Sequence, residues 1–338
     1  MKRRTFLMSA AGAAACGRSG ARLNVFNWSS YVAPDTISNF ERESGLRVRY
    51  ATYESAQEML AKVMGGNSGW DVVFPSAEYV EPMRELNLLA PLRHEWLPNL
   101  DSLAAEFQKP PWDPALGWAV PYMHGTTGIA YDRKLNITQW ADLWESRMAG
   151  KITMLDDAPE VFGACLKLAS ESLNTTDPEE LRAAARRAME QKPLLRAYLN
   201  SEVMDQLVAG DISAAQAWGT TAAQAIAAAP DRLAYVLPKE GFARYADNAA
   251  ILRESTRPEA AHRFLNYLLR PRVAADVAIA MHTATCNGAG QALLPPELRE
   301  DTVLYPAADT LLRGEWFQAQ PSVSQRLRDR LWTEVKSA

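Results

Sequence analysis

The stretch that decides the fold is Leu23-Asn-Val-Phe-Asn-Trp-Ser-Ser-Tyr31. It begins as a strand, because Leu23 and Val25 fall on one face of an alternating pattern. It ends in an indole, two hydroxyls and a phenol, which together rarely form a core. In a parallel α/β sheet, ligands bind at the carboxyl ends of the strands. Trp28 and Tyr31 therefore either face a ligand or serve as core aromatics that each need one polar partner.

The composition is that of an ordinary globular protein. The chain has 338 residues, of which 48% are hydrophobic and 22% charged, a length that suits about two domains. Its net charge is −4, and removal of residues 1–15, which carry three basic and no acidic side chains, changes this to −7. The charge argues against a nucleic-acid partner and is compatible with a cationic ligand, although net charge mainly affects solubility.

Residues 1–16 have the pattern of an export signal. Three basic residues at 2–4 precede an apolar run that is too short to span a membrane. The segment 3–7 (Arg-Arg-Thr-Phe-Leu) resembles a twin-arginine signal, and 13–17 (Ala-Ala-Ala-Cys-Gly) resembles a lipoprotein cleavage site. We expect a periplasmic or other extracytoplasmic location with Cys16 lipidated, and membrane contact only through that anchor. Ordinary signal cleavage near Ala15 is the alternative.

Strands and helices alternate after the opening strand. Strands are predicted at 46–50 and 70–74, and helices at 34–44 and 55–64, the second of which opens with a capping box. Strand, helix, strand, helix, strand within about 55 residues is typical of a right-handed parallel α/β unit. The predicted fold class is therefore α/β.

The chain is predicted to cross twice between two lobes. Segments 118–122 and 127–131 look like paired strands around Gly125, where we place the first crossing, and 244–251 forms the second. The lobes are expected to comprise residues 21–123 plus 248–290, and residues 124–247 plus 291–338.

The rest of the chain continues the alternation. Strands are predicted at 152–155, 213–217 and 233–237. Helices are predicted from 140, from 159, from 174 to 190, and over 202–208, 221–229, 258–281 (interrupted at Pro271) and most of 287–338.

The cysteines and histidines show neither a metal-ligand spacing nor a disulfide framework. Cys165 lies in an apolar helical run and is predicted to be a small buried hydrophobe. Cys286 lies in a loop-like stretch, and the sequence does not decide whether these two residues form a disulfide. We expect no metal and no cofactor.

Aromatic, small polar or acidic side chains follow several predicted strands. Nucleophile motifs, phosphate-binding loops and dinucleotide fingerprints are absent from the sequence, so this pattern points to binding. Aromatic faces attract a desolvated ammonium by roughly 2 kcal/mol each, and carboxylates offset the cost of burying its charge. Each residue also has a simpler explanation, such as helix capping for Asp157 or core packing for Trp218, and only their convergence is specific. The candidates are Trp28, Ser29, Tyr31, Ser76, Glu78, Asp157, Glu160, Trp218, Tyr245 and Asp247.

A series of short motifs runs from about Leu23 to Trp316. They are 27–32 (Asn-Trp-Ser-Ser-Tyr-Val), 52–55 (Thr-Tyr-Glu-Ser), 75–80 (Pro-Ser-Ala-Glu-Tyr-Val), 140–144 (Trp-Ala-Asp-Leu-Trp), 156–162 (Asp-Asp-Ala-Pro-Glu-Val-Phe), 174–178 (Asn-Thr-Thr-Asp-Pro), 268–271 (Leu-Leu-Arg-Pro) and 304–306 (Leu-Tyr-Pro). Their order and residue patterns resemble those of bacterial periplasmic spermidine/putrescine-binding proteins, the solute-binding proteins of ABC polyamine importers.

The resemblance implies a periplasmic-binding-protein fold, in which two α/β lobes joined by crossover strands close on a ligand by hinge motion. It implies capture of a putrescine- or spermidine-like cation and its delivery to ABC permease subunits in the inner membrane. It also implies that Asp247 and Glu160 pair with amino groups while the rings stack on the aliphatic chain. We expect a monomer without catalytic activity.

The chain departs from the family pattern toward one end of the expected site. Ser30 stands where the family usually has an acid and Glu78 where it has Tyr or Ser, as if a carboxylate had moved to the neighbouring strand end. Tyr245 replaces a Trp or Phe. Thr283 and Phe317 replace residues that are usually Tyr and often Gln, and these two and Ser30 are additional candidates. The alternative ligands are a different small amine, an amino acid derivative or another solute. A remote alternative function is that of a hydrolase with its active site in the cleft.

Overall fold

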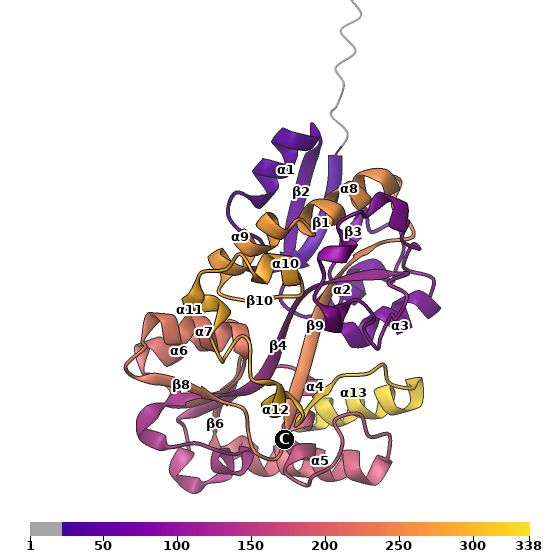
Figure 1. Cartoon of the computed structure of the whole chain (residues 1–338). Helices are drawn as coiled ribbons and strands as arrows, with labels where there is room; N and C mark the ends of the chain where they lie inside the picture. Colours follow the sequence, from indigo (N-terminus) through magenta and orange to yellow (C-terminus); the bar gives the residue numbers. More distant parts are fainter. Residues whose placement is uncertain (1–21) are drawn as a thin grey trace, which may run out of the picture.

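The computed structural model describes residues 22–338, so the predicted export signal and Cys16 lie outside the described part. Two long antiparallel strands, β4 (Ala119–Asp132) and β9 (Phe242–Ile251), run side by side between an upper and a lower group of helices and strands (Figure 1). The chain therefore passes between the two groups through these strands.

The first part of the chain is the parallel α/β unit that the sequence predicts. Its elements are β1 (Arg22–Trp28), α1 (Thr36–Ser44), β2 (Arg47–Tyr53), α2 (Ala56–Val63), β3 (Val72–Val73) and α3 (Ala77–Glu85). Strand β1 pairs in parallel with both β2 and β3. Gly45, in the left-handed conformation, ends α1, and the Ser55 hydroxyl caps α2 by accepting from the Glu58 N–H. The strand and helix predictions for this region are confirmed.

The prediction of two paired strands around Gly125 is wrong. Residues 119–132 form the single strand β4, and both of its halves pair with β9. Gly125 is required by packing, because a Cβ there would collide with the phenol of Tyr245 on the neighbouring strand. A glycine needed for close approach was therefore mistaken for a turn.

The lower group continues the same sheet. Its elements are β5 (Ile152–Met154), α4 (Ala158–Lys167), α5 (Pro178–Gln191), β6 (Leu195–Tyr198), α6 (Val203–Ala209), β7 (Ala214–Trp218), α7 (Gly219–Ala228) and β8 (Leu233–Val236). The main strand order is β2-β1-β3-β9-β4-β7-β5-β6. Strand β6 was not predicted, and the helix expected from Trp140 is two short 3₁₀ segments, Trp140–Trp144 and Ser146–Met148.

The C-terminal part returns to both groups. Its elements are α8 (Pro258–Leu268), α9 (Pro271–Met281), β10 (Ala284–Thr285), α10 (Gly288–Gln291), α11 (Pro296–Arg299), α12 (Ala308–Leu311), β11 (Gly314–Trp316) and α13 (Ser322–Ser337). The predicted interruption at Pro271 is confirmed. Strand β11 was not predicted, and it pairs in parallel with the start of β9.

Separate hydrophobic cores lie on either side of the crossing strands. One contains Leu23, Phe264 and, from the first half of β4, Val120. Another contains Phe162 and, from the second half of β4, Ile129. We infer that the lobe boundaries 123/124 and 247/248 fall within β4 and β9, and the two sides are called the first and second lobes below. Residues 291–304 pack against helices of both lobes.

Cys165 and Cys286 are free and fully buried, so the disulfide that the sequence left open is not formed. Within residues 22–338, no helix has both the length and the apolar character needed to cross a membrane. The same residues contain no cluster of His, Cys, Asp and Glu arranged to hold a metal ion.

Candidate functional site

A cavity lies where the ends of β1, β3 and β7 meet the crossing strand β9. All ten main candidates line it, as do Ser30 and Phe317. Thr283 does not, and that assignment is corrected. Its side chain is fully buried behind the wall, with its hydroxyl 2.9 Å from Thr220 Oγ1. Thr283 therefore supports a wall residue instead of facing the cavity.

Asp247 is the most completely bonded acid of the cavity. It lies on β9 and is only 3% exposed. Tyr31 donates to Oδ2 and Ser76 donates to Oδ1, each over 2.6 Å. Burial raises the pKa of Asp247 to about 6, while the hydrogen bonds from Ser76 and Tyr31 oppose that rise. Two residues of the first lobe thus orient this carboxylate.

Glu160 is held from the second lobe. It lies in the first turn of α4, where Asp157 caps the helix by accepting from the Glu160 N–H over 3.1 Å. Its Oε1 accepts from Thr127 Oγ1 over 2.8 Å and from Trp218 Nε1 over 2.9 Å, whereas its buried Oε2 has no partner. Burial, followed by the charge of Asp157, raises the pKa of Glu160 to about 8. The second oxygen is therefore available to a ligand.

Glu78 and Asp157 add two further carboxyl groups. Glu78 lies in the first turn of α3, and its buried Oε2 has no partner. Burial, aided by the charges of Asp157 and Asp247, raises the pKa of Glu78 to about 8. Burial also raises the pKa of Asp157 to about 6. These shifts share one cause, the removal of carboxylates from water without a cation beside them.

Aromatic rings line the space between these acids. Trp28 is fixed by an indole hydrogen bond of 2.9 Å to the Phe74 carbonyl, and its ring lies 6.4 Å from that of Tyr31. Trp218, Tyr245 and Phe317 complete the aromatic part of the wall. Among residues 22–338, the lining includes no Lys, Arg or His side chain. A cavity of this kind favours a cation with apolar segments and disfavours an anion.

The chain matches the model of the bacterial extracellular solute-binding proteins over residues 35–302. The chain belongs to this family. It is 36% identical to the spermidine/putrescine-binding periplasmic protein of Salmonella typhimurium, with 94% of each chain covered. It is 30% identical to the putrescine/cadaverine-binding protein of Pseudomonas aeruginosa, with 99% of each covered. A solved chain from Listeria monocytogenes superposes with a TM-score of 0.90 at 31% identity, covering 93% of this chain and 98% of that one.

The family and fold expected from the motifs are thus confirmed. Members of the family are solute-binding proteins and not enzymes, which agrees with the expectation of a non-catalytic site. The cavity of this solute-binding protein is accordingly interpreted as a binding site, and the roles of its residues follow from their contacts.

Several lining residues were missed by sequence reasoning. Glu54 directly follows β2, so the strand-end rule applied to that strand would have found it. It accepts from Ser29 of the first lobe over 3.1 Å and from Ser201 of the second over 3.4 Å. Ser201, Thr220 and Gln224 carry no comparable signal in the sequence.

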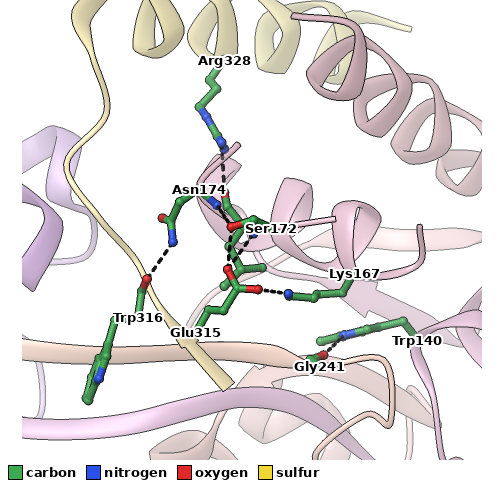
Figure 2. Close-up of polar contacts among 9 residues, drawn as sticks. Trp140, Lys167, Ser172, Asn174, Gly241, Glu315, Trp316 and Arg328 are labelled. Atoms are coloured by element: carbon green, nitrogen blue, oxygen red, sulfur yellow. Dashed lines mark hydrogen bonds and ion pairs between the residues drawn. The ribbon is translucent and has the colours of Figure 1, made fainter. Parts of the chain in front are cut away.

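A second polar cluster lies at the far end of α4 (Figure 2). Glu315 of β11 accepts from Lys167 and from Ser172, the latter over 2.7 Å. Partial burial alone would raise the pKa of Glu315, but the hydrogen bonds from Lys167 and Ser172 lower it. This cluster holds β11 on the second lobe, and Phe317, two residues further on, lines the cavity.

Proposed function

We propose that this solute-binding protein captures a polyamine, such as putrescine or spermidine, for import by an ABC transporter. The observation that carries the proposal is the charge of the cavity. Within the described part of the chain, its lining has five acidic side chains, Glu54, Glu78, Asp157, Glu160 and Asp247, and no basic one. Relatives that bind spermidine, putrescine or cadaverine by name support the same ligand class.

The ammonium groups of a polyamine would supply the positive charge that the cavity lacks. Asp247 and Glu160 are the proposed partners of amino groups, because both are almost fully buried and each is oriented by two side-chain donors. Trp28, Tyr31 and Trp218 would then contact the methylene segments between the charges. Binding is non-covalent and needs no cofactor.

The family acts outside the cytoplasm, as the periplasmic relatives indicate. We propose in addition that Cys16 carries a lipid anchor and that a monomer delivers the ligand to the permease subunits. Mass spectrometry of the protein purified from whole cells would show the lipidated Cys16, or a chain beginning after Ala15 without lipid if only ordinary cleavage occurs.

A thermal-shift panel tests the ligand class. Putrescine, cadaverine and spermidine should each raise the melting temperature, because a ligand at 100 times its Kd stabilises the folded state by about 2.7 kcal/mol. γ-Aminobutyrate, which has the length of putrescine but a carboxylate at one end, should give no shift because the cavity is acidic. Shifts with the zwitterion and none with the amines would contradict the proposal and favour another solute.

A further inference from the structure

Two pairs of neighbouring residues, on β9 and at the end of β11, send their side chains to opposite faces. On β9, Tyr245 lines the cavity, and Arg244 before it points to the other face because strand side chains alternate. Phe317 lines the cavity as well, and Trp316 before it packs against the core of the first lobe. Arg244 and Trp316 are partners in the pairing of β9 with β11. They therefore lie side by side on the face of the crossing strands opposite the cavity.

The backbone around Trp316 is fixed to the second lobe. Its carbonyl accepts from Asn174 Nδ2 over 2.9 Å (Figure 2), and the N–H of Gln318 donates to Asn174 Oδ1, also over 2.9 Å. Glu315, one residue earlier, is held by Lys167. The segment on both sides of Trp316 therefore moves with the second lobe.

The side chain of Trp316, in contrast, contacts the first lobe. Its ring centre lies 5.2 Å from that of Trp112 and 6.2 Å from that of Phe107, both in edge-on geometry. Trp112 is anchored within the first lobe, because its indole donates to Asn248 Oδ1 over 2.9 Å. The ring of Trp316 therefore bridges the two lobes.

Arg244 makes a second bridge at the same place. Its guanidinium carbon lies 4.0 Å from the centre of the Trp316 ring, and the same guanidinium pairs with Glu106 of the first lobe. The Arg244 side chain is only 12% exposed, so water and salt screen it less than they screen a surface charge. One guanidinium thus joins Trp316 of the second lobe to Glu106 of the first.

The described orientation of the lobes is a closed one. Ser201 of the second lobe donates to Glu54 of the first across the mouth of the cavity, over 3.4 Å. Acids of both lobes oppose this closure, because the charge of Glu78, after burial and the charge of Asp157, raises the pKa of Glu160. Closure without a ligand therefore needs favourable contacts between the lobes elsewhere.

We propose that Trp316, Arg244 and Glu106 form an interlobe clamp, on the face of the crossing strands opposite the cavity, that holds the lobes in the closed orientation and so sets the affinity for the ligand. These are positioning residues, since they act through the orientation of the lobes. The clamp does not depend on which solute binds, although the affinity measurements below rest on the proposed polyamine function.

The clamp acts on the population of the closed orientation. A ligand that binds only closed lobes has an apparent Kd equal to its intrinsic Kd divided by the closed fraction. Opening moves Glu106 and Trp112 with the first lobe, away from a Trp316 that is fixed to the second. The stacking, the edge-on contacts and the ion pair are thus made in the closed orientation and lost on opening.

Calorimetry with putrescine compares Trp316→Leu with the matched control Trp332→Leu. Trp332 is also half-buried, contacts two rings edge-on (Phe162 and Tyr198) and has the ammonium of Lys336 over its ring, but all of these partners lie in the second lobe. We expect Trp316→Leu to weaken putrescine by about 10-fold and Trp332→Leu by less than about 2-fold. Both variants should lower the melting temperature.

Two further variants separate the clamp from general damage. Trp316→Phe keeps an aromatic ring at the clamp and should bind putrescine within about 3-fold of wild type. Glu106 is exposed, so Glu106→Gln should fold normally. It should weaken putrescine by about 3-fold in wild type and by less in Trp316→Leu, because Arg244 couples the two residues.

Small-angle X-ray scattering of the unliganded proteins tests the clamp without a ligand. Trp316→Leu should have a larger radius of gyration than wild type, because its lobes open more often. Trp332→Leu should have the wild-type value, since its lost contacts lie within one lobe.

The outcomes separate the clamp from the proposed function. If the affinity of Trp316→Leu falls while its radius of gyration stays that of wild type, Trp316 acts only through its neighbour Phe317 and the clamp is wrong. Equal losses of affinity in Trp316→Leu and Trp332→Leu would also overturn it. If wild type does not bind putrescine, the proposed ligand class fails, and the scattering alone decides the clamp.

Discussion

The two ends of α4 differ in whether a buried charged side chain has a partner of opposite charge. At its first turn, Glu160 is 5% exposed, and no basic side chain from the described residues lines the cavity that it faces. At its last turn, Lys167 is 7% exposed and pairs with Glu315 (Figure 2). Burial raises the pKa of Glu160 to about 8, whereas the pKa of Glu315, in contact with Lys167, is lowered. Glu315 is less buried than Glu160, but partial burial would still raise its pKa, so the lowering comes from its bonds with Lys167 and Ser172.

The difference separates a structural charge from a functional one. At the last turn the chain supplies both members of the ion pair, and their bond holds β11 in place. At the first turn it supplies oriented carboxylates and omits the cation. Leaving a buried charge unpaired costs stability, and we propose that the ligand supplies the missing cation.

The largest expected effect comes from neutralising an acid at the ligand end. Asp247→Asn and Glu160→Gln should each weaken putrescine binding by about 30-fold or more, since truncating one partner of a buried charge pair costs about 2–5 kcal/mol. The free energy of unfolding of the unliganded protein should stay the same or rise, because a buried charge without a counter-ion is removed. Calorimetry and urea denaturation measure the two quantities.

Glu315→Gln is the matched control at the other end of α4. It should lower the free energy of unfolding and leave putrescine affinity within about 3-fold of wild type, which follows from removing a structural charge. Wild-type affinity in both Asp247→Asn and Glu160→Gln would break the comparison, because the acids of the cavity would then not be ligand partners.

The next effect concerns the structural end. Lys167→Met leaves the partly buried Glu315 without its cation and should reduce the free energy of unfolding by about 2 kcal/mol. The double variant Lys167→Met with Glu315→Gln should recover part of that loss. Arg182→Met, which breaks an exposed pair with Glu179, should cost no more than about 0.5 kcal/mol. If Lys167→Met lowered the free energy of unfolding as little as Arg182→Met, the buried pair would not be structural.

The sequence was sufficient for elements whose local pattern agrees with the fold. Alternating strands and helix start and stop signals predicted β1 to β3 because propensity, periodicity and capping coincide there, whereas α3 was not predicted. Strands β6 and β11 were missed because they are short and exist through pairing with distant strands. Gly125 was misread because the ring that demands a glycine belongs to Tyr245, on the other crossing strand.

The candidate site was predictable to the extent that strand ends gather at one edge of a sheet. That rule collected Trp28 and Ser76, whereas Asp247 was chosen for its place in the second crossing. The contacts of Asp247 join residues up to 216 positions apart. The rule could not reveal which oxygens stay unpaired, because that depends on the orientation of side chains from both lobes. Thr283 was included for its position in the family pattern, but its side chain lies behind Thr220, which lines the cavity in its place.

The smallest expected effect is a pH dependence of the stability of the unliganded protein. Burial raises the pKa values of Glu78 and Glu160 to about 8, far above those of exposed glutamates. The folded state therefore binds more protons than the unfolded state between pH 4.5 and 8, and its stability falls as pH rises through that window. The buried His124 has its pKa lowered to about 3 and acts with the opposite sign, but only below about pH 6.5.

The range from pH 6.5 to 8 thus isolates the two glutamates. The melting temperature should fall by roughly 2 °C or more across it, and saturating putrescine should abolish or reverse the fall because the ligand stabilises the ionised carboxyls. Glu315 gives the contrasting sign, since its lowered pKa provides stability that is lost only as pH falls below about 4.5. Scanning calorimetry of wild type and of the double variant Glu78→Gln with Glu160→Gln measures the effect. The same slope in both proteins would place the titrating groups elsewhere and remove the contrast between the two ends of α4.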